Sequence, residues 1–97
     1  IVEIIDLRTL NPIDKDIIES SVKKTSKVLV VHEDNMTNGP GAEISALIVD
    51  KYFQLLDAPV RRVAAKDSPV PFNWILEEKV LPQSQEIADV IEEILEY

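Results

Sequence analysis

The chain has 97 residues, of which 45% are apolar and 29% charged, so its composition is that of one small globular domain. Its 18 acidic and 10 basic residues give a formal net charge of −8, which disfavours nucleic acid and anionic membranes as partners and favours a basic protein. The absence of cysteine excludes disulfides, thiolate catalysis and cysteine-ligated metals.

The chain opens on a strand pattern at residues 1–7, and a connecting loop then leads into a helix. Asp14 is suited to cap the amino end of this helix, and Ile13 before it can pack on Ile18 as a hydrophobic staple. Lys23 and Lys24 place positive charge at the negative end of the helix dipole. Because the sequence starts inside a strand, we expect residues 1–97 to be the carboxyl-terminal domain of a longer chain.

A second strand is predicted at residues 27–31, where a short β-branched run indicates a strand buried on both faces of a parallel sheet. A polar loop follows, with Gly39 a candidate helix cap and Pro40 suited to the first helical turn. This order places the loop at the carboxyl edge of the sheet, where α/β folds usually bind ligands. The next helix should face the sheet through an apolar stripe made of Ile44, Leu47, Ile48, Tyr52 and Leu55.

Residues 57–59 end that helix, and residues 60–65 are predicted to form a third strand on which Arg61 and Arg62 point to opposite sides. After a proline-containing loop at residues 66–71 and an apolar segment at 72–76, Ser84 is the predicted cap of a final, acid-rich helix. The predicted buried face of this helix consists of Ile87, Val90, Ile91, Ile94 and Leu95.

Strands that alternate with helices of this length predict an α/β fold with three layers, helices covering both faces of a mostly parallel sheet. Three strands are few for such a sheet, so we expect part of it to lie upstream.

Few residues offer chemistry. His32, the only histidine, stands beside Glu33 at the carboxyl end of the second strand, where it could move protons. A histidine that hydrogen-bonds within the loop and caps the sheet edge is the favoured interpretation, because no nucleophile or second base is near in sequence. The turn at residues 38–41 could receive an anion on backbone amides, although a plain tight turn is favoured because the P-loop and dinucleotide motifs are incomplete. His32, Glu33 and Arg61 are expected at an interface or crevice.

Four blocks of sequence in a fixed order resemble the carboxyl-terminal domain of the transketolase superfamily. Within it, the chain is most similar to the β subunit of the thiamine-dependent 2-oxo acid dehydrogenase E1 component, of the pyruvate, branched-chain or acetoin type. The usual first strand and helix of that domain are absent, and the turn at 38–41 departs from the common Gly-Gly-Phe-Gly. The blocks are residues 6–12 (DLRTLNP), 31–34 (VHED) with 39–44 (GPGAEI), 56–63 (LDAPVRRV) and 67–72 (DSPVPF).

The resemblance implies a parent enzyme that holds thiamine diphosphate and Mg²⁺ between other domains, so that no catalytic, cofactor-binding or metal-binding residue is expected here. It implies that this domain binds an E1 α subunit or fused α region, a second β subunit, and the small basic peripheral subunit-binding domain of the acyltransferase (E2). The implied E2 contacts are Asp57 and, if Tyr97 is the native end of the chain, the carboxylate of Tyr97. The parent is expected in a bacterial cytoplasm or, in a eukaryote, the mitochondrial matrix.

Two alternatives remain open. The first is the same domain of another superfamily enzyme, a transketolase or a deoxyxylulose-phosphate synthase. The second is a free-standing flavodoxin-like module that binds a small anion at residues 39–42.

Overall fold

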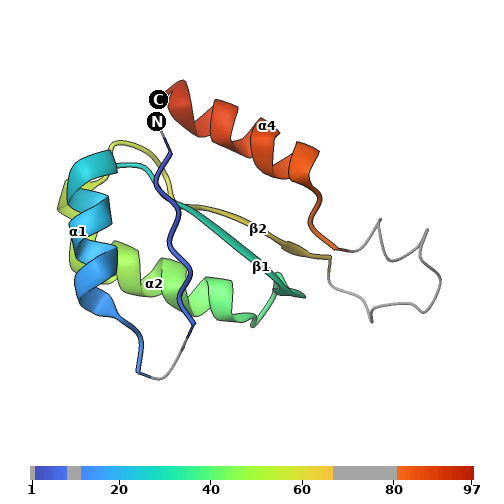
Figure 1. Cartoon of the computed structure of the whole chain (residues 1–97), viewed down its shortest axis with the longest axis horizontal. Coiled ribbons are helices and arrows are strands. Elements are labelled where there is room, and N and C mark those ends of the chain that lie inside the picture. Colours follow the sequence, from blue (N-terminus) through green and yellow to red (C-terminus); the bar gives the residue numbers. More distant parts are fainter. Residues whose placement is uncertain (1, 9–11, 67–80) are drawn as a thin grey trace.

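The computed structural model describes residues 2–8, 12–66 and 81–97 (Figure 1). Residues 67–80 contain all but the first residue of the predicted proline loop, and the whole apolar segment at 72–76, so those predictions lie outside the described part. No helix within the described ranges is long and apolar enough to cross a membrane. In chain order the elements are α1 (Lys15–Thr25), β1 (Leu29–Asn35), α2 (Pro40–Tyr52), a 3₁₀ turn η1 (Phe53–Leu55), β2 (Arg61–Ala65) and α4 (Ser84–Leu95).

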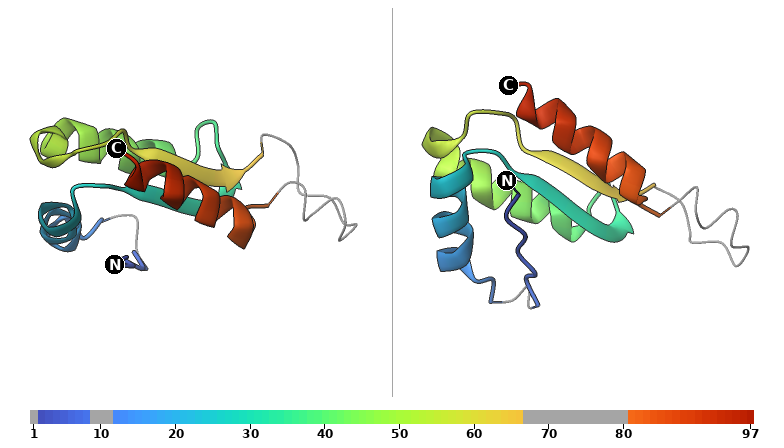
Figure 2. Two further views of the ribbon diagram at one scale, coloured as in Figure 1. Left: turned by 90° about the horizontal axis from the view of Figure 1, so that it is seen from above. Right: turned by 45° about the horizontal axis from the view of Figure 1, so that its top comes forward.

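The described sheet is parallel, as predicted, and pairs β1 with β2. Leu29 pairs with Arg61 and Val31 with Val63, so both strands begin at the same edge of the molecule. Helix α2 packs on one face of this pair and α4 on the other (Figure 2). The three-layer α/β architecture is therefore confirmed.

One hydrophobic core joins α1, β1 and α2. Ile44 and Ile48 of α2 are buried against Val30 of β1, and the rest of the predicted stripe on α2 and η1 packs at its margin. Apolar side chains at helical spacing reach the same neighbour, which is why the stripe predicts the packed face. The five buried residues of this core are Ile18, Val22, Val30, Ile44 and Ile48.

The helix ends agree with the prediction in two of three places. The Asp14 carboxylate accepts a hydrogen bond from the Ile17 amide at 3.2 Å, so Asp14 caps α1. Gly39 is the cap of α2, and Pro40 lies at its first position. The prediction for the last helix is wrong: Gln83 is the cap residue, its side chain makes no capping bond, and Ser84 is already helical.

The strand predicted at residues 1–7 is wrong for the described residues 2–8, which form no strand. Ile4 is 88% exposed, and β1 pairs only with β2 among the described strands. An alternating apolar pattern becomes a strand only when a neighbour accepts its backbone hydrogen bonds.

Two further differences concern exposure and length. Val31 is 44% exposed, so β1 is not buried on both faces, because a sheet described by two strands leaves part of β1 uncovered. Leu95 is also exposed instead of buried, since it points away from the packed side of α4. Strand β1 runs on to Asn35, beyond its predicted end at residue 31, so His32 and Glu33 belong to the strand and not to the loop.

Candidate functional site

The residues singled out from the sequence gather at the two opposite ends of the strand pair. Asp57 and Arg61 lie where the strands begin, because the Asp57 amide donates to the Ser26 carbonyl at 2.8 Å and the Arg61 amide donates to the Val28 carbonyl at 3.3 Å. These two backbone bonds tie the connection before β2 to the connection before β1. His32 and Glu33 lie toward the other end, so Arg61 is not part of their surroundings.

Tyr97 is brought to the same edge as Asp57 by two basic side chains. The Lys27 ammonium donates to the main-chain oxygen of Tyr97 at 2.9 Å, and Nη2 of Arg61 lies 3.4 Å from the Tyr97 hydroxyl. The same Nη2 forms an ion pair with Oε1 of Glu93 at 2.7 Å. We call Lys27, Asp57, Arg61, Glu93 and Tyr97 the amino-edge cluster.

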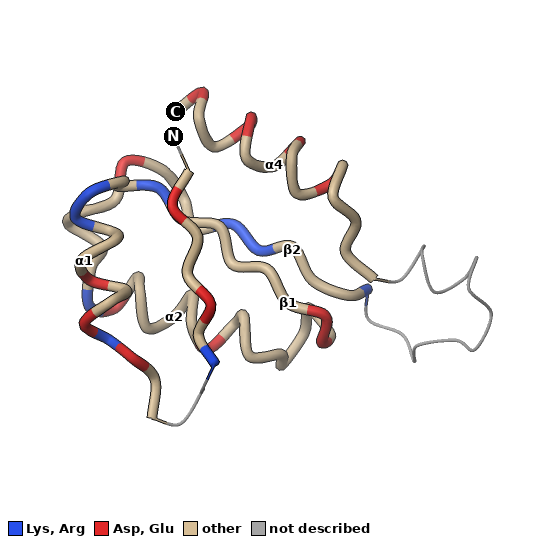
Figure 3. The backbone as a smooth tube through the Cα atoms, in the orientation of Figure 1, with Lys and Arg blue, Asp and Glu red and all other residues tan. Residues whose placement is uncertain are grey.

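The amino-edge cluster is accessible to a partner. Asp57 is exposed, and its carboxylate makes no hydrogen bond or ion pair with any described residue. Glu93 and Arg61 are each partly exposed despite their ion pair. Acidic residues recur along the whole of α4, whereas the nearby positive charge is on β2 and between α1 and β1 (Figure 3). The surface therefore presents the exposed carboxylate of Asp57 near the acidic helix α4, and Arg61 and Lys27 bind the carboxyl end of that helix.

At the other end of the strands, His32 packs against the beginning of α2. A Cβ atom added to Gly41 would lie 2.5 Å from Cδ2 of His32, and one added to Gly39 would lie 2.9 Å from Cε1. Both distances are shorter than real Cβ contacts, so the imidazole occupies the space that the two glycines leave.

His32 has no visible partner for acid–base chemistry. Both ring nitrogens are buried and form no hydrogen bond with the described residues. Glu33, next to it, is exposed, and strand neighbours point to opposite faces. Val31 pairs with Val63 and Asn35 with Ala65, so β1 is irregular across His32, Glu33 and Asp34. The hydrogen bonds expected of a structural histidine in this loop are therefore not formed with the described residues, and the ring is held by its packing against Gly39 and Gly41.

The loop after β1 is secured by Arg62. Its Nη1 donates to the Met36 carbonyl at 2.8 Å, and the Met36 amide donates to the Ala65 carbonyl at 3.1 Å. Arg61 and Arg62 thus act at different places, Arg61 at the amino edge and Arg62 at the carboxyl edge of the sheet. That the two side chains point to opposite faces of the sheet stays a prediction.

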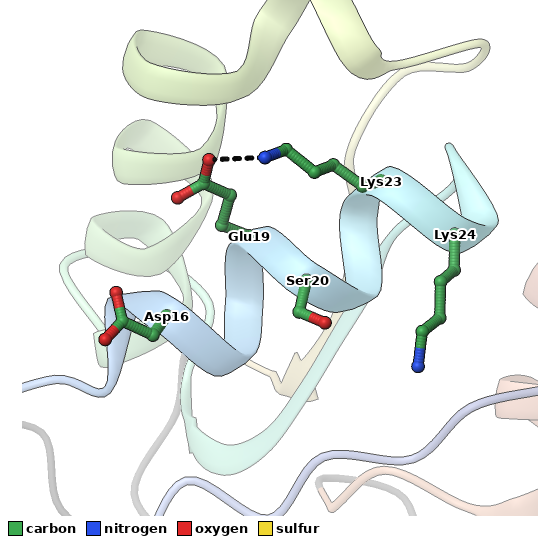
Figure 4. Close-up of a pocket in the computed structure, with 5 residues that line it drawn as sticks. All are labelled: Asp16, Glu19, Ser20, Lys23 and Lys24. Carbon is green, nitrogen blue, oxygen red and sulfur yellow. Dashed lines mark ion pairs between the residues drawn. The ribbon is translucent and has the colours of Figure 1, made fainter.

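A shallow surface depression of about 430 Å³ runs along α1 (Figure 4). Its side chains come from one helix, and Glu19 forms an ion pair with Lys23 at 3.0 Å across it. Nearby, burial and the Glu19 and Asp16 carboxylates raise the pKa of Tyr52 above its ordinary value of 10.0. Neither feature brings together groups that could catalyse a reaction. The depression is lined by Asp16, Glu19, Ser20, Lys23 and Lys24.

Comparison with known proteins decides the family. Residues 1–87 match the family described as the transketolase C-terminal domain. The chain belongs to this family. The domain is 41% identical over 93 residues to the acetoin:2,6-dichlorophenolindophenol oxidoreductase subunit beta of Bacillus subtilis, covering 96% of the chain and 27% of that relative.

Two further relatives of the domain are named as dehydrogenase β subunits. The mitochondrial 2-oxoisovalerate dehydrogenase subunit beta 2 of Arabidopsis thaliana is 45% identical over 95 residues, which is 98% of the chain and 26% of the relative. The pyruvate dehydrogenase E1 component subunit beta of Rickettsia felis is 39% identical over 95 residues, 98% of the chain and 29% of the relative. The domain thus spans between a quarter and a third of these relatives, and the resemblance to E1 β subunits is confirmed.

Sequence reasoning missed the residues that hold the domain's amino edge together. Lys27 was grouped with the second strand, and Glu93 was one of several acids on the last helix, with no signal to distinguish it.

Proposed function

We propose that the chain is the assembly and E2-docking domain of the β subunit of a 2-oxo acid dehydrogenase E1 component. The parent enzyme would decarboxylate a 2-oxo acid on thiamine diphosphate and transfer the acyl group to lipoyl groups of E2. The domain itself would bind the α region, a second β subunit, and the basic peripheral subunit-binding domain of E2. Asp57 and Tyr97 would contact the E2 domain.

The observation that carries this proposal is the meeting of Asp57 and Tyr97 at one edge. The two residues are 40 positions apart in the sequence, yet they contact the consecutive residues Ser26 and Lys27. Both residues are exposed, and the Asp57 carboxylate is unpaired with the described residues, so a basic partner has access to them. The net charge of −8 would speed the encounter by electrostatic steering.

In this proposal thiamine diphosphate and Mg²⁺ are held by other domains of the parent, as the resemblance to E1 β subunits implies, and no catalytic step is derived from this chain. Among residues 2–8, 12–66 and 81–97, no group of three or more His, Asp or Glu side chains could hold a metal ion.

A pull-down tests the docking proposal. The complete β subunit, assembled with its α subunit, is offered to an immobilised E2 peripheral subunit-binding domain at low and at high salt. We expect retention at low salt and release at high salt, since contacts between exposed charges are screened. No retention at low salt would remove the docking function.

The alternatives are less well supported. The relatives reported above are all named as oxidoreductase or dehydrogenase β subunits, which favours that branch over a transketolase or a deoxyxylulose-phosphate synthase. For the anion-binding module, the turn shows His32 packed against Gly39 and Gly41 and no observation that points to a bound anion. No observation favours either alternative specifically.

A further inference from the structure

Helix α4 is attached to the sheet mainly near its carboxyl end. Ile94 is its one buried residue among those described, at 4% exposure, whereas Ile87, Val90 and Ile91 are only partly covered. Its cap residue Gln83 makes no side-chain capping bond. A helix with so little buried area needs further contacts to keep a fixed position.

The last turn of α4 also lacks compensation for its negative end. It contains no basic residue, and Glu92, Glu93 and Glu96 add negative charge where the helix dipole is already negative. Cations near a helix carboxyl terminus stabilise it, and acids there do the opposite. Taken alone, this helix end is electrostatically unfavourable.

The missing positive charge is supplied from the strands. Arg61, the first residue of β2, pairs with Glu93 at 2.7 Å and reaches the Tyr97 hydroxyl at 3.4 Å. Lys27, just before β1, donates to the Tyr97 main-chain oxygen at 2.9 Å. Nε of Arg61 is buried and forms no hydrogen bond with the described residues, while the side chain as a whole is 40% exposed, so the guanidinium contacts α4 at the edge of the solvent.

We infer that Arg61, assisted by Lys27, is a positioning residue for partner docking. Its ion pair holds the carboxyl end of α4 beside Asp57, so that the acidic groups meet a basic partner in one fixed arrangement. This inference rests on the proposed function. It gives a docking role to a positively charged residue. Charge complementarity alone would instead predict that a positive charge on this surface opposes the binding of a basic partner.

The two explanations predict opposite changes in binding affinity when Arg61 loses its charge, so the direction of the change tests the inference. Replacing Arg61 with methionine makes the surface more acidic by one charge, so charge complementarity alone predicts tighter binding of a basic partner. Loss of positioning predicts weaker binding, because the partner must then order α4 as it binds. The two explanations cannot both hold for Arg61→Met.

The experiment measures the affinity of the assembled β subunit for the E2 peripheral subunit-binding domain, with four proteins compared: wild type, Arg61→Met, Lys15→Met, and the charge-swapped double variant Arg61→Glu with Glu93→Arg. Lys15→Met is the matched control, because it removes one exposed positive charge at the start of α1, away from the cluster. Hydrogen exchange of residues 91–97 in the free subunit gives a readout independent of the partner.

We expect Arg61→Met to weaken binding about two- to fivefold, the range that a partly exposed ion pair supplies. Lys15→Met should leave binding equal or slightly tighter, and the charge swap should regain most of the loss. Residues 91–97 should exchange faster in Arg61→Met than in Lys15→Met. Unchanged or tighter binding by Arg61→Met, while wild type binds, overturns the inference and leaves the docking function standing.

The remaining outcomes are also decisive. If the wild type does not bind, the proposed docking function is wrong. If residues 91–97 then also exchange at equal rates in all variants, Arg61 does not hold the end of α4 in place either. If Arg61→Met does not fold, the charge-swapped variant carries the test, since it keeps the pair and the net charge. Failure of that folded variant to bind as wild type does would contradict the inference.

Discussion

The contact between His32 and the two glycines predicts a specific pattern of stability changes. A Cβ at Gly41 would meet only the His32 ring, whereas a Cβ at Gly39 would also meet the backbone carbonyl oxygen of Asn35. A side chain can move away when its neighbour grows, but a backbone carbonyl that belongs to a turn cannot do so cheaply. Replacing either glycine with alanine should destabilise the chain, and the two variants should respond differently to removal of His32.

The magnitudes follow from opposing terms. Overpacking at either position costs about 2 kcal/mol, the middle of the usual range. At Gly41, a helical position, alanine regains up to about 1 kcal/mol of helix propensity, so the net loss is about 1–2 kcal/mol. At Gly39, the helix cap, alanine is the poorer cap by about 0.5–1 kcal/mol, so the loss is about 2–3 kcal/mol.

Urea unfolding followed by circular dichroism measures these losses. With a slope of about 1 kcal/mol per molar urea, Gly41→Ala should lower the unfolding midpoint by about 1–2 M and Gly39→Ala by about 2–3 M. In a His32→Ala background, Gly41→Ala should become neutral or stabilising, while Gly39→Ala should still destabilise because the Asn35 carbonyl remains. A stabilising Gly41→Ala in the presence of His32, or equal rescue of both variants, would refute this account of the contact.

Three further predictions concern the helix ends and one phenol. Asp14→Ala should destabilise the chain by about 1 kcal/mol in the same urea assay, because the Ile17 amide loses its acceptor. Ser84→Ala should change stability by less than about 0.5 kcal/mol, since Ser84 is a helical residue and not the cap; a loss near 1 kcal/mol would contradict the structure. The pKa of Tyr52 is raised, chiefly by burial, so its contribution to stability is complete below the ordinary tyrosine value of 10.0 and disappears as pH rises through the higher folded value. Absorbance titration of tyrosinate, compared with Tyr52→Phe, should show a component that ionises above pH 10, and its absence would contradict the assignment.

Much of the fold follows from local pattern. Ile44 and Ile48 at helical spacing predict the packed face of α2, and Asp14 before a helical run predicts a cap, because both signals depend on near neighbours in sequence. The segment at residues 1–7 shows the limit of this reasoning. Its alternation is typical of a strand, but a strand also needs a pairing partner, which sequence pattern alone cannot supply.

The site was predictable in part. Asp57, Arg61 and Tyr97 were each singled out, and contacts to residues 26 and 27 bring them to one edge. Glu93 could not be chosen among the acids of α4, since the partner of a surface carboxylate depends on which helix face meets the sheet. The contact of His32 with Gly41 depends on close approach in three dimensions, so the glycines indicated only a turn.

The most direct test of docking compares two carboxylate-to-amide substitutions by titration calorimetry. Asp57→Asn removes the free carboxylate of the amino-edge cluster, and Glu43→Gln removes an exposed carboxylate from the first turn of α2. In the assembled β subunit, titrated with the E2 peripheral subunit-binding domain at low salt, Asp57→Asn should weaken binding about tenfold or more, and Glu43→Gln should leave it within about twofold of wild type. Equal affinities for Asp57→Asn and wild type would contradict the assignment of this edge as the docking surface.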